Sequence, residues 1–200
     1  MTEIHEQAPP VPRVVIAEDE ALIRMDLAEM LMEQGYEVVA QATNGQEAID
    51  SARLHQPDLV VLDIKMPKVD GIAAATVIAS ERIAPIVMLT AFSQRELIER
   101  ARDAGAMAYV VKPFGPHDLV PAIELARARF EEIRVLAQET ADLRDQLETR
   151  KLIERAKSLI QEHLGISESE SFSWIQRTAM DLRLPMRDVA KTIIEKGFTA

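Results

Sequence analysis

Four short apolar runs along the chain each end on a side chain that can carry chemistry. Continuous apolar runs of about 4–8 residues between polar positions are typical of buried parallel strands. Because the carboxyl ends of parallel strands share one edge of a sheet, the side chains that follow the runs are expected to converge there. The runs are Val14–Ala17 before Glu18 and Asp19, Leu59–Leu62 before Asp63, Ile86–Leu89 before Thr90, and Tyr109–Val111 before Lys112.

Segments with the apolar spacing of amphipathic helices alternate with these runs, and Tyr36–Ala40 reads as a further strand. Such alternation predicts an α/β fold, a doubly wound five-stranded parallel sheet with helices on both faces. We expect this domain to cover residues 13–120, after a tail over residues 1–12. The predicted helices cover 22–31 before the helix-ending Gly35, 48–54, a segment after Gly71, and Gln94–Gly105.

A long helix follows this domain. From Pro116 to about Arg150 there is no glycine, and Ile133, Leu136, Leu143 and Leu147 recur at helical steps with Thr140 inside the stripe. The linking part, residues 121–150, offers about three heptads with one polar core position, which is marginal for an isolated coiled coil. Packing on its own domain and a short dimeric coiled coil therefore both stay open.

The end of the chain predicts a small all-α module of three helices over residues 151–197. Its helices are expected at Lys151–His163, from Ser167 to about Asp181, and at Pro185–Lys196. Ser167 and Glu170 have the spacing of a capping box. In the middle helix we expect Phe172, Ile175, Ala179 and Met180 to be buried, and Trp174 to lie off that stripe.

Charge divides the chain in the same way. The net charge is -10 over 200 residues, which argues against nonspecific nucleic-acid binding by the whole protein. From Lys151 onward eight basic residues face seven acidic ones, a balance of +1, so residues 1–150 carry -11. Zero cysteines exclude disulfides and thiolate sites. No apolar stretch approaches a membrane span or a signal peptide, so we expect a cytoplasmic protein without a membrane partner.

The expected edge of the sheet carries three carboxylates, a hydroxyl and an ammonium. Carboxylates crowded together repel unless a cation holds them. With no His or Cys beside Glu18, Asp19 and Asp63, the oxygen ligands favour Mg²⁺. A carboxylate near a metal, with Lys112 and Thr90 to meet phosphoryl oxygens, suits phosphoryl transfer, and Asp63 is the candidate nucleophile for an aspartyl phosphate.

Residues 13–120 resemble the receiver domain of two-component response regulators. The resemblance rests on Glu18-Asp19-Glu20, the segment Asp63–Gly71, Thr90-Ala91 and Lys112-Pro113-Phe114. It implies that Asp63 accepts a phosphoryl group from a sensor histidine kinase, and that the backbone carbonyl of Lys65 joins Glu18, Asp19 and Asp63 around Mg²⁺. It further implies that Thr90 and Lys112 bind the phosphoryl group, that Tyr109 changes rotamer, and that the Lys112–Pro113 bond is cis. Glu18 stands where Asp is commoner.

The C-terminal module resembles the ANTAR domain, an RNA-binding antitermination module. The resemblance rests on Ala156-Lys157, Phe172–Ile175, Ala179–Arg183 and Val189-Ala190, with Ser171 where the family has Ala. It implies a regulator of transcription termination that binds RNA hairpins through unstacked loop bases and phosphates. The candidate RNA contacts are Arg155, Lys157, Trp174, Arg177 and Arg183.

Two other functions compete with this interpretation. The first is a response regulator whose output binds DNA or another protein, although Pro185–Lys196 has few residues suited to reading bases. The second is an Mg²⁺-dependent phosphatase; such enzymes carry an acid two residues after the nucleophile, where this chain has Lys65. We therefore expect no enzyme beyond slow self-dephosphorylation. A homodimer through the linking helix or the C-terminal module is a further expectation.

Overall fold

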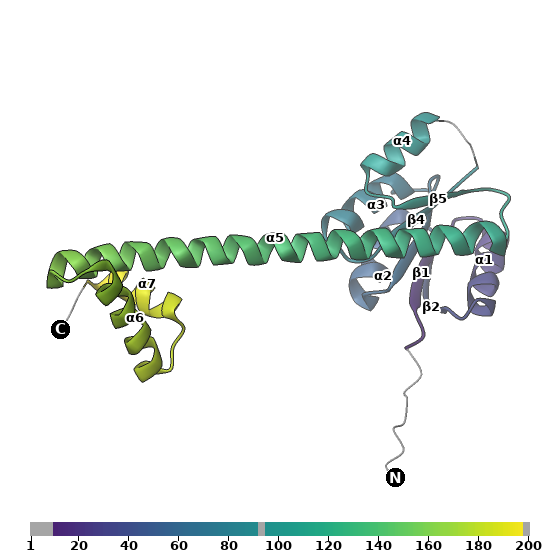
Figure 1. The fold of residues 1–200 in the computed structure, drawn as a ribbon. Helices are drawn as coiled ribbons and strands as arrows, with labels where there is room; N and C mark the ends of the chain where they lie inside the picture. The colour runs from purple at the N-terminus through teal and green to yellow at the C-terminus, as the bar shows by residue number, and fades with distance from the viewer. Residues whose placement is uncertain (1–9, 92–94, 198–200) are drawn as a thin grey trace, which may run out of the picture. The chain divides into compact units, whose positions relative to one another are not determined.

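The computed structural model describes residues 10–91 and 95–197 (Figure 1). The chain divides into two compact units, Met1–Arg134 and Val135–Ala200, and each is described by itself. Most of the predicted tail, and the predicted helix start at Gln94, lie outside the described residues.

The first unit is built on a parallel sheet of five strands, as predicted. In the strand order β2-β1-β3-β4-β5, β1 lies between β2 and β3, so the chain crosses over β1 on its way from β2 to β3. This reversal of direction across the sheet is typical of the doubly wound arrangement. β1 pairs with both β2 and β3, and all pairs are parallel. The strands are β1 (Arg13–Ala17), β2 (Glu37–Ala42), β3 (Leu59–Asp63), β4 (Ile86–Thr90) and β5 (Ala108–Val111).

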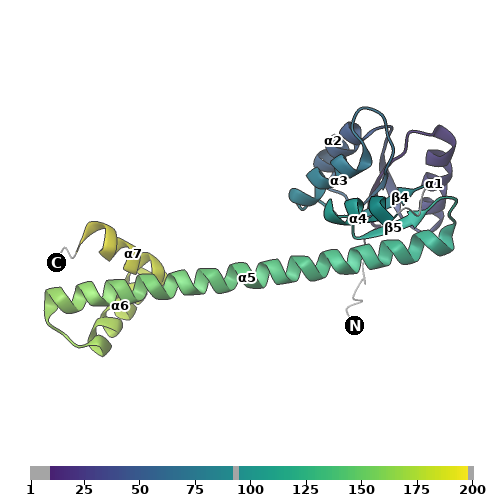
Figure 2. The same cartoon turned by 90° about the horizontal axis from the view of Figure 1, so that it is seen from above.

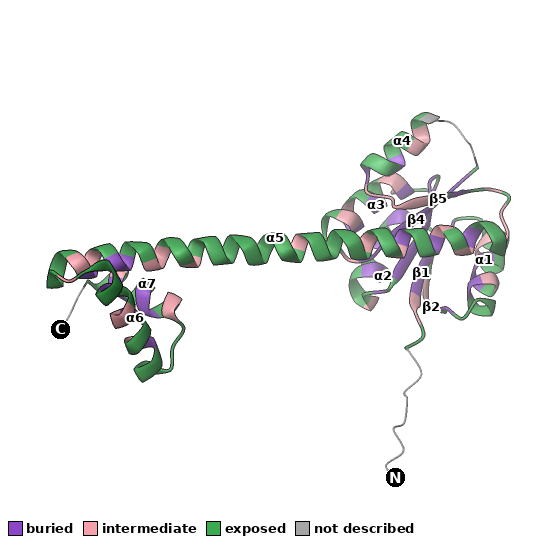
Figure 3. Ribbon diagram, viewed as in Figure 1, coloured by how far each residue is buried: buried purple, intermediate pink, exposed green. Residues whose placement is uncertain are grey.

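Helices cover both faces of the sheet (Figure 2). Successive strand residues point to opposite faces, and two separate apolar clusters result. One cluster packs the sheet against α2, α3 and α4, and the other packs it against α1 and the start of α5. The strands are therefore buried from both sides, as the burial colours of Figure 3 show. The helices are α1 (Ala21–Glu33), α2 (Gly45–His55), α3 (Gly71–Ser80), α4 (Arg95–Asp103) and α5 (Pro116–Leu164).

Helix α5 is longer than the sequence predicted. We expected one helix to about Arg150 and a second from Lys151, but the structure has a single helix of 49 residues. The prediction of a break was wrong because neither Gly nor Pro lies near residue 150 to interrupt the backbone hydrogen bonds. The helix ends before Gly165, which has a left-handed φ of 64°.

The second unit packs α6 (Glu168–Leu182) and α7 (Met186–Lys196) against the C-terminal part of α5. The predicted capping box is confirmed, since the Ser167 hydroxyl accepts from the Glu170 N–H and the Glu170 carboxylate accepts from the Ser167 N–H. The core of the unit consists of Ala156, Ile160, Ile175, Ala179, Val189, Ala190 and Ile193. None of the helices in the described ranges is both long and apolar enough to cross a membrane.

The buried face of α6 differs in part from the prediction. Ile175 and Ala179 are buried as expected, but Phe172 is 42% exposed and Met180 is 71% exposed. Ser171, four residues before Ile175, occupies the core position instead and is fully buried. Its hydroxyl donates to the Ser167 carbonyl at 2.8 Å, so this buried polar group has a partner inside the helix.

Candidate functional site

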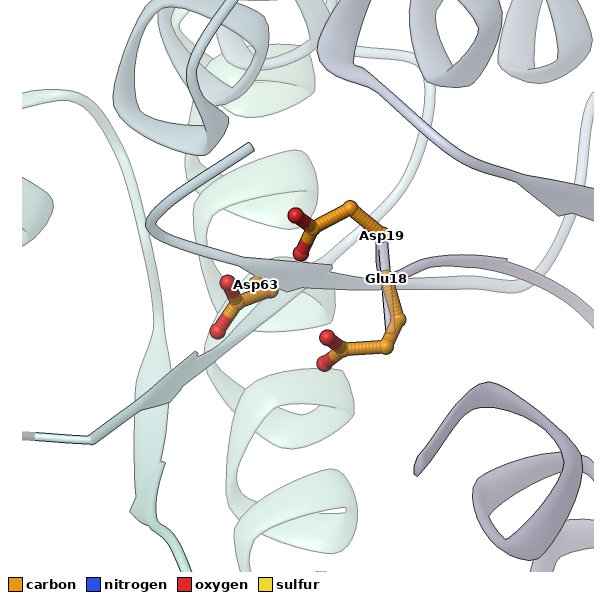
Figure 4. A group of neighbouring side chains, drawn as sticks. All are labelled: Glu18, Asp19 and Asp63. Carbon is orange, nitrogen blue, oxygen red and sulfur yellow. The ribbon is translucent and has the colours of Figure 1, made fainter. Parts of the chain in front are cut away.

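The predicted carboxylates converge at the carboxyl edge of the sheet. β1 and β3 are neighbours, with Ala17 opposite Leu62, so Glu18 and Asp19 after β1 come beside Asp63 at the end of β3. Figure 4 shows the three carboxyl groups turned toward a common space. A ligand oxygen from each lies within 4.8 Å of the other two. The strand topology alone therefore assembles the acidic cluster.

Lys112 joins this cluster from the end of β5. Its ammonium lies 2.6 Å from the Glu18 carboxylate and 2.8 Å from the Asp63 carboxylate. Glu18 is fully buried, and Asp63 is 5% exposed. Two buried carboxylates thus share one ammonium, while the carboxylate of the exposed Asp19 lies at the rim.

The protonation of these groups reflects their burial. Burial raises the pKa of Glu18 and the pKa of Asp63, because desolvation penalises the charged form more than the contacts with Lys112 favour it. Repulsion from a neighbouring acid adds to the effect of burial: Asp63 raises the pKa of Glu18, and Asp19 raises the pKa of Asp63. Burial alone would lower the pKa of Lys112, but the hydrogen bonds with Asp63 and Glu18 outweigh it, and its pKa is raised.

A cavity of about 240 Å³ opens above Asp63. Its walls include Asp19, Lys65, Thr90 and Lys112, together with Leu97 of α4. The Lys65 backbone N–H donates to the Asp63 carboxylate at 3.0 Å, and Thr90 is buried at the end of β4. The predicted phosphoryl-binding side chains thus line one small space that contains the candidate nucleophile.

Tyr109 lies on β5, three residues before Lys112. Its side chain is 48% exposed and lines a groove with Ile98 of α4 and Leu125 of α5. The Lys112–Pro113 peptide bond is cis, as the resemblance implied. Tyr109 is therefore not enclosed in the core, and its ring has room to change rotamer.

Two residues that hold the backbone of the site could not be identified from the sequence. Arg24 of α1 donates from one guanidinium nitrogen to the carbonyls of Glu18 at 2.6 Å and Asp19 at 3.4 Å. Gly71, expected only to open a helix, lies so close to Asp63 that a Cβ there would meet its carbonyl oxygen at 1.9 Å. Both hold the backbone that carries the acids, and an interaction with backbone leaves no side-chain pattern to read.

The candidate RNA contacts lie in the second unit and differ in accessibility. Arg155, Arg177 and Arg183 are exposed, and Trp174 is half-buried. Lys157 is only 6% exposed. Its ammonium binds the carboxylates of Glu154 at 3.0 Å and Glu168 at 2.6 Å. Lys157 thus ties α5 to α6 rather than facing solvent, so its ammonium is not available as an RNA contact.

The doubly wound sheet with acids and a lysine at its carboxyl edge defines the class of the first unit, and the sequence model of the response regulator receiver domain matches residues 14–124. The chain belongs to the response regulator family. The sequence model of the ANTAR domain matches residues 141–194.

Known proteins are similar to the whole chain or to its first unit. The chain is 65% identical to the transcriptional regulatory protein PdtaR of Mycobacterium tuberculosis over 183 residues, which cover 92% of this chain and 89% of that protein. Chemotaxis protein CheY of Bacillus subtilis is 40% identical over 112 residues, 56% of this chain and 93% of CheY. Among solved structures, a LuxR-family two-component response regulator from Aurantimonas has a TM-score of 0.56 at 31% identity, covering 68% of this chain and 99% of that one.

Proposed function

We propose that this response regulator accepts a phosphoryl group on Asp63 from a sensor histidine kinase, and that phosphorylation controls binding of RNA hairpins and thereby transcription termination. The convergence of Glu18, Asp19, Asp63 and Lys112, the last three of which line one small cavity, carries the first part of the proposal. The ANTAR match carries the second. Because phosphodonor and transcript both belong to the cytoplasm, we propose that the protein acts there.

The residues around Asp63 have complementary parts in the transfer. A carboxylate oxygen of Asp63 attacks phosphorus, the bond from phosphorus to the kinase imidazole nitrogen breaks, and the imidazole leaves with the electron pair. The Lys112 ammonium, 2.8 Å from Asp63, is placed to meet the negative phosphoryl oxygens. The Thr90 hydroxyl, which lines the same cavity, would donate to another of them. Hydrolysis of the resulting acyl phosphate would be slow, since Lys65 stands where a phosphatase has an acid.

The donor set fits Mg²⁺. Glu18, Asp19 and Asp63 offer hard oxygen ligands within 4.8 Å of one another, and the two buried acids share the single ammonium of Lys112. We propose that these carboxylates, with the Lys65 carbonyl, hold the ion. When bound, Mg²⁺ supplies the positive charge that lets phosphoryl oxygens approach the acids.

Transfer of charge to Asp63 would change the contacts of Lys112 and Thr90. Lys112 is shared between Glu18 and Asp63 before transfer, and a phosphoryl group would draw it and the Thr90 hydroxyl to itself. Such a group favours whichever arrangement of β4 and β5 offers both contacts, and so shifts the population of conformations. Tyr109, half-exposed on β5, would report this shift on the outer face of the domain.

The RNA-binding part of the proposal concerns the second unit. Arg155, Arg177 and Arg183 offer exposed positive charge for phosphates, and Trp174 offers an aromatic surface for an unstacked base. Residues 151–200, which include α6 and α7, have a charge of +1, against -11 for residues 1–150. Only this part of the chain is therefore free of a strong net repulsion of RNA.

A second copy of the chain is a proposed partner. Leu136, Leu143 and Leu147 of α5 are 55%, 60% and 58% exposed, and with Thr140 they follow the spacing of a coiled-coil seam. We propose that this stripe contributes to a homodimer, which sedimentation of the full chain would detect.

The decisive experiment compares Asp63→Asn with the wild type, each with and without a small phosphodonor and Mg²⁺. Intact-mass measurement should show a phosphoryl group on the wild type alone, and the affinity for an RNA of two adjacent hairpins should respond to the donor only there. Asp26→Asn, on the exposed face of α1, is the matched control and should behave as the wild type does. A response of Asp63→Asn to the donor as large as that of the wild type, in RNA affinity and in sedimentation, would refute the role of Asp63, and preference for duplex DNA would refute the RNA output.

A further inference from the structure

A shallow groove runs along one side of α6 and combines three kinds of side chain. Its volume is about 490 Å³, and it is lined by Ile166, Ser169, Glu170, Ser173, Trp174, Arg177, Thr178 and Asp181. These residues recur at helical steps, so they form one continuous strip of the helix surface. The strip places an aromatic ring, a guanidinium and carboxylates next to one another.

Trp174 gives the groove a fixed aromatic surface. Its side chain packs against the apolar cluster of the second unit and also lines the groove. A ring held by the core loses little conformational freedom when a ligand stacks on it. Trp174 is therefore suited to be a stacking platform, whereas the more exposed Phe172 lies outside the groove.

Arg177 and Asp181 are the polar groups available to a ligand. Both are exposed, and neither makes an ion pair or side-chain hydrogen bond within the described parts of the chain. The Glu170 carboxylate, in contrast, is occupied by the capping box with Ser167. The groove thus has one unengaged donor group and one unengaged acceptor group beside an aromatic ring.

The acids in the groove decide what kind of RNA group it suits. With Glu170 and Asp181 against Arg177, the groove carries a net negative charge, which disfavours a run of phosphates. A carboxylate instead accepts hydrogen bonds from base N–H groups. Guanine is the base whose pairing edge offers two adjacent N–H donors, the ring N1–H and the 2-amino group, and it matches the two oxygens of one carboxylate.

We propose that this groove reads an unstacked guanine of an RNA loop. The base stacks on Trp174, its N1–H and 2-amino groups donate to the Asp181 carboxylate, and Arg177 binds the flanking phosphate. This inference rests on the proposed RNA-binding function and adds the base and the residues that select it. Asp181 would thus select guanine over the other bases, although its negative charge alone would argue against a place in an RNA-binding surface.

The test uses the phosphorylated full chain and hairpin RNA selected from a pool of two-hairpin RNAs with randomised loops. Loop guanines are then replaced one at a time by inosine, which lacks the 2-amino donor. For the wild type, inosine at one loop position should weaken binding about tenfold or more, as expected for loss of a hydrogen bond to a charged group. In Asp181→Asn the same replacement should have little further effect, because the charged acceptor is already gone.

Two further variants separate stacking from folding. Trp174→Ala should weaken binding about 5- to 150-fold, the range for loss of one stacked base, and Trp174→Phe should restore most of it. Gln176→Ala, exposed on α6 outside the groove, is the control and should bind as the wild type does. Circular dichroism verifies that each variant keeps its helices.

The outcomes separate this inference from the proposed function. If the wild type binds no hairpin of the pool in either phosphorylation state, the RNA function itself fails. If the wild type binds but Trp174→Ala, Asp181→Asn and Gln176→Ala bind equally well, the groove is not the reading site and the inference alone fails. A change in sedimentation without a change in RNA affinity would assign the groove to a protein contact and also overturn the inference.

Discussion

Replacement of Gly71 by alanine tests how tightly the proposed phosphorylation site is built into the fold. Gly71 begins α3, and its N–H donates to the Ile64 carbonyl at 2.9 Å. An added Cβ would lie 1.9 Å from the Asp63 carbonyl oxygen, whereas ordinary contact begins at 3.4 Å, so the backbone would have to separate by about 1.5 Å. The atoms that clash belong to the main chain of β3 and cannot turn away as a flexible side chain does.

The expected cost follows from that geometry. Overpacking a well-filled site costs about 1–3 kcal/mol, and displacement of main chain places Gly71→Ala at the upper end, about 3 kcal/mol. For a domain of this size the melting temperature should fall by roughly 10 °C or more. We also expect slower phosphoryl acceptance, because the displaced carbonyl belongs to Asp63 itself. Thermal melting followed by circular dichroism, and the rate of phosphorylation by a small phosphodonor, measure the two effects.

Gly115→Ala is the matched control for this experiment. Gly115 lies in the same unit, and a Cβ there would have nothing within 4 Å. Its substitution should change the free energy of unfolding by about 1 kcal/mol or less. If Gly71→Ala melted with Gly115→Ala and was phosphorylated as fast, the close approach of α3 to β3 would not constrain the site, and the reasoning would be refuted.

Three other predictions concern single charged residues. Arg24→Ala should weaken Mg²⁺ binding about tenfold in calorimetry, as loss of a group that supports metal ligands does, and wild-type affinity would show that the loop needs no such support. Burial raises the pKa of Asp63. Asp63 therefore favours folding most below about pH 4, the pKa of aspartate in the unfolded chain, and this contribution is lost as the pH rises through its pKa in the folded protein. Asp63→Asn should therefore raise the free energy of unfolding in urea by about 1 kcal/mol at pH 7.5, with a smaller gain at pH 4.5; an equal gain at both would contradict this. Lys157→Met should leave the affinity for hairpin RNA within about twofold of wild type, whereas Arg177→Met should weaken it, and equal losses would show that Lys157 does reach RNA.

The sheet and the convergence of its strand ends could be predicted because both follow from chain connectivity. Parallel strands joined by helices must all point the same way, so residues after successive strands meet at one edge without any knowledge of strand order. Asp63, Thr90 and Lys112 were found in this way. The order β2-β1-β3-β4-β5 adds which of them are direct neighbours, and that information comes only from the structure.

Contacts with main-chain atoms could not be predicted. Arg24 acts on the carbonyls of Glu18 and Asp19, and Gly71 acts by leaving room for the carbonyl of Asp63. Every residue has a carbonyl, so the sequence offers no partner type to search for at a given spacing. Only the path of the β1–α1 loop and the start of α3 identifies these two residues.

The burial of Lys157 could not be predicted from the sequence. Lys157 was grouped with exposed basic residues because a lysine is almost always at the surface. One of its partners, Glu154, lies three residues earlier on the same helix and could have been noticed. The other, Glu168, follows the helix-ending Gly165 and comes from α6, so the pairing that buries Lys157 depends on how two helices fold back on each other.

Glu18 stands where Asp is commoner, and its longer side chain matters for the balance of charge. Glu18 reaches the ammonium of Lys112 at 2.6 Å while fully buried, so the ammonium of Lys112 is divided between two buried acids. A phosphoryl group on Asp63 adds charge to an edge that already has an excess of it, and Lys112 cannot pair fully with both the phosphoryl oxygens and Glu18. Stable phosphorylation of Asp63, as proposed, would therefore need a second cation at the carboxylates, which is the physical reason to expect that phosphoryl acceptance depends on Mg²⁺.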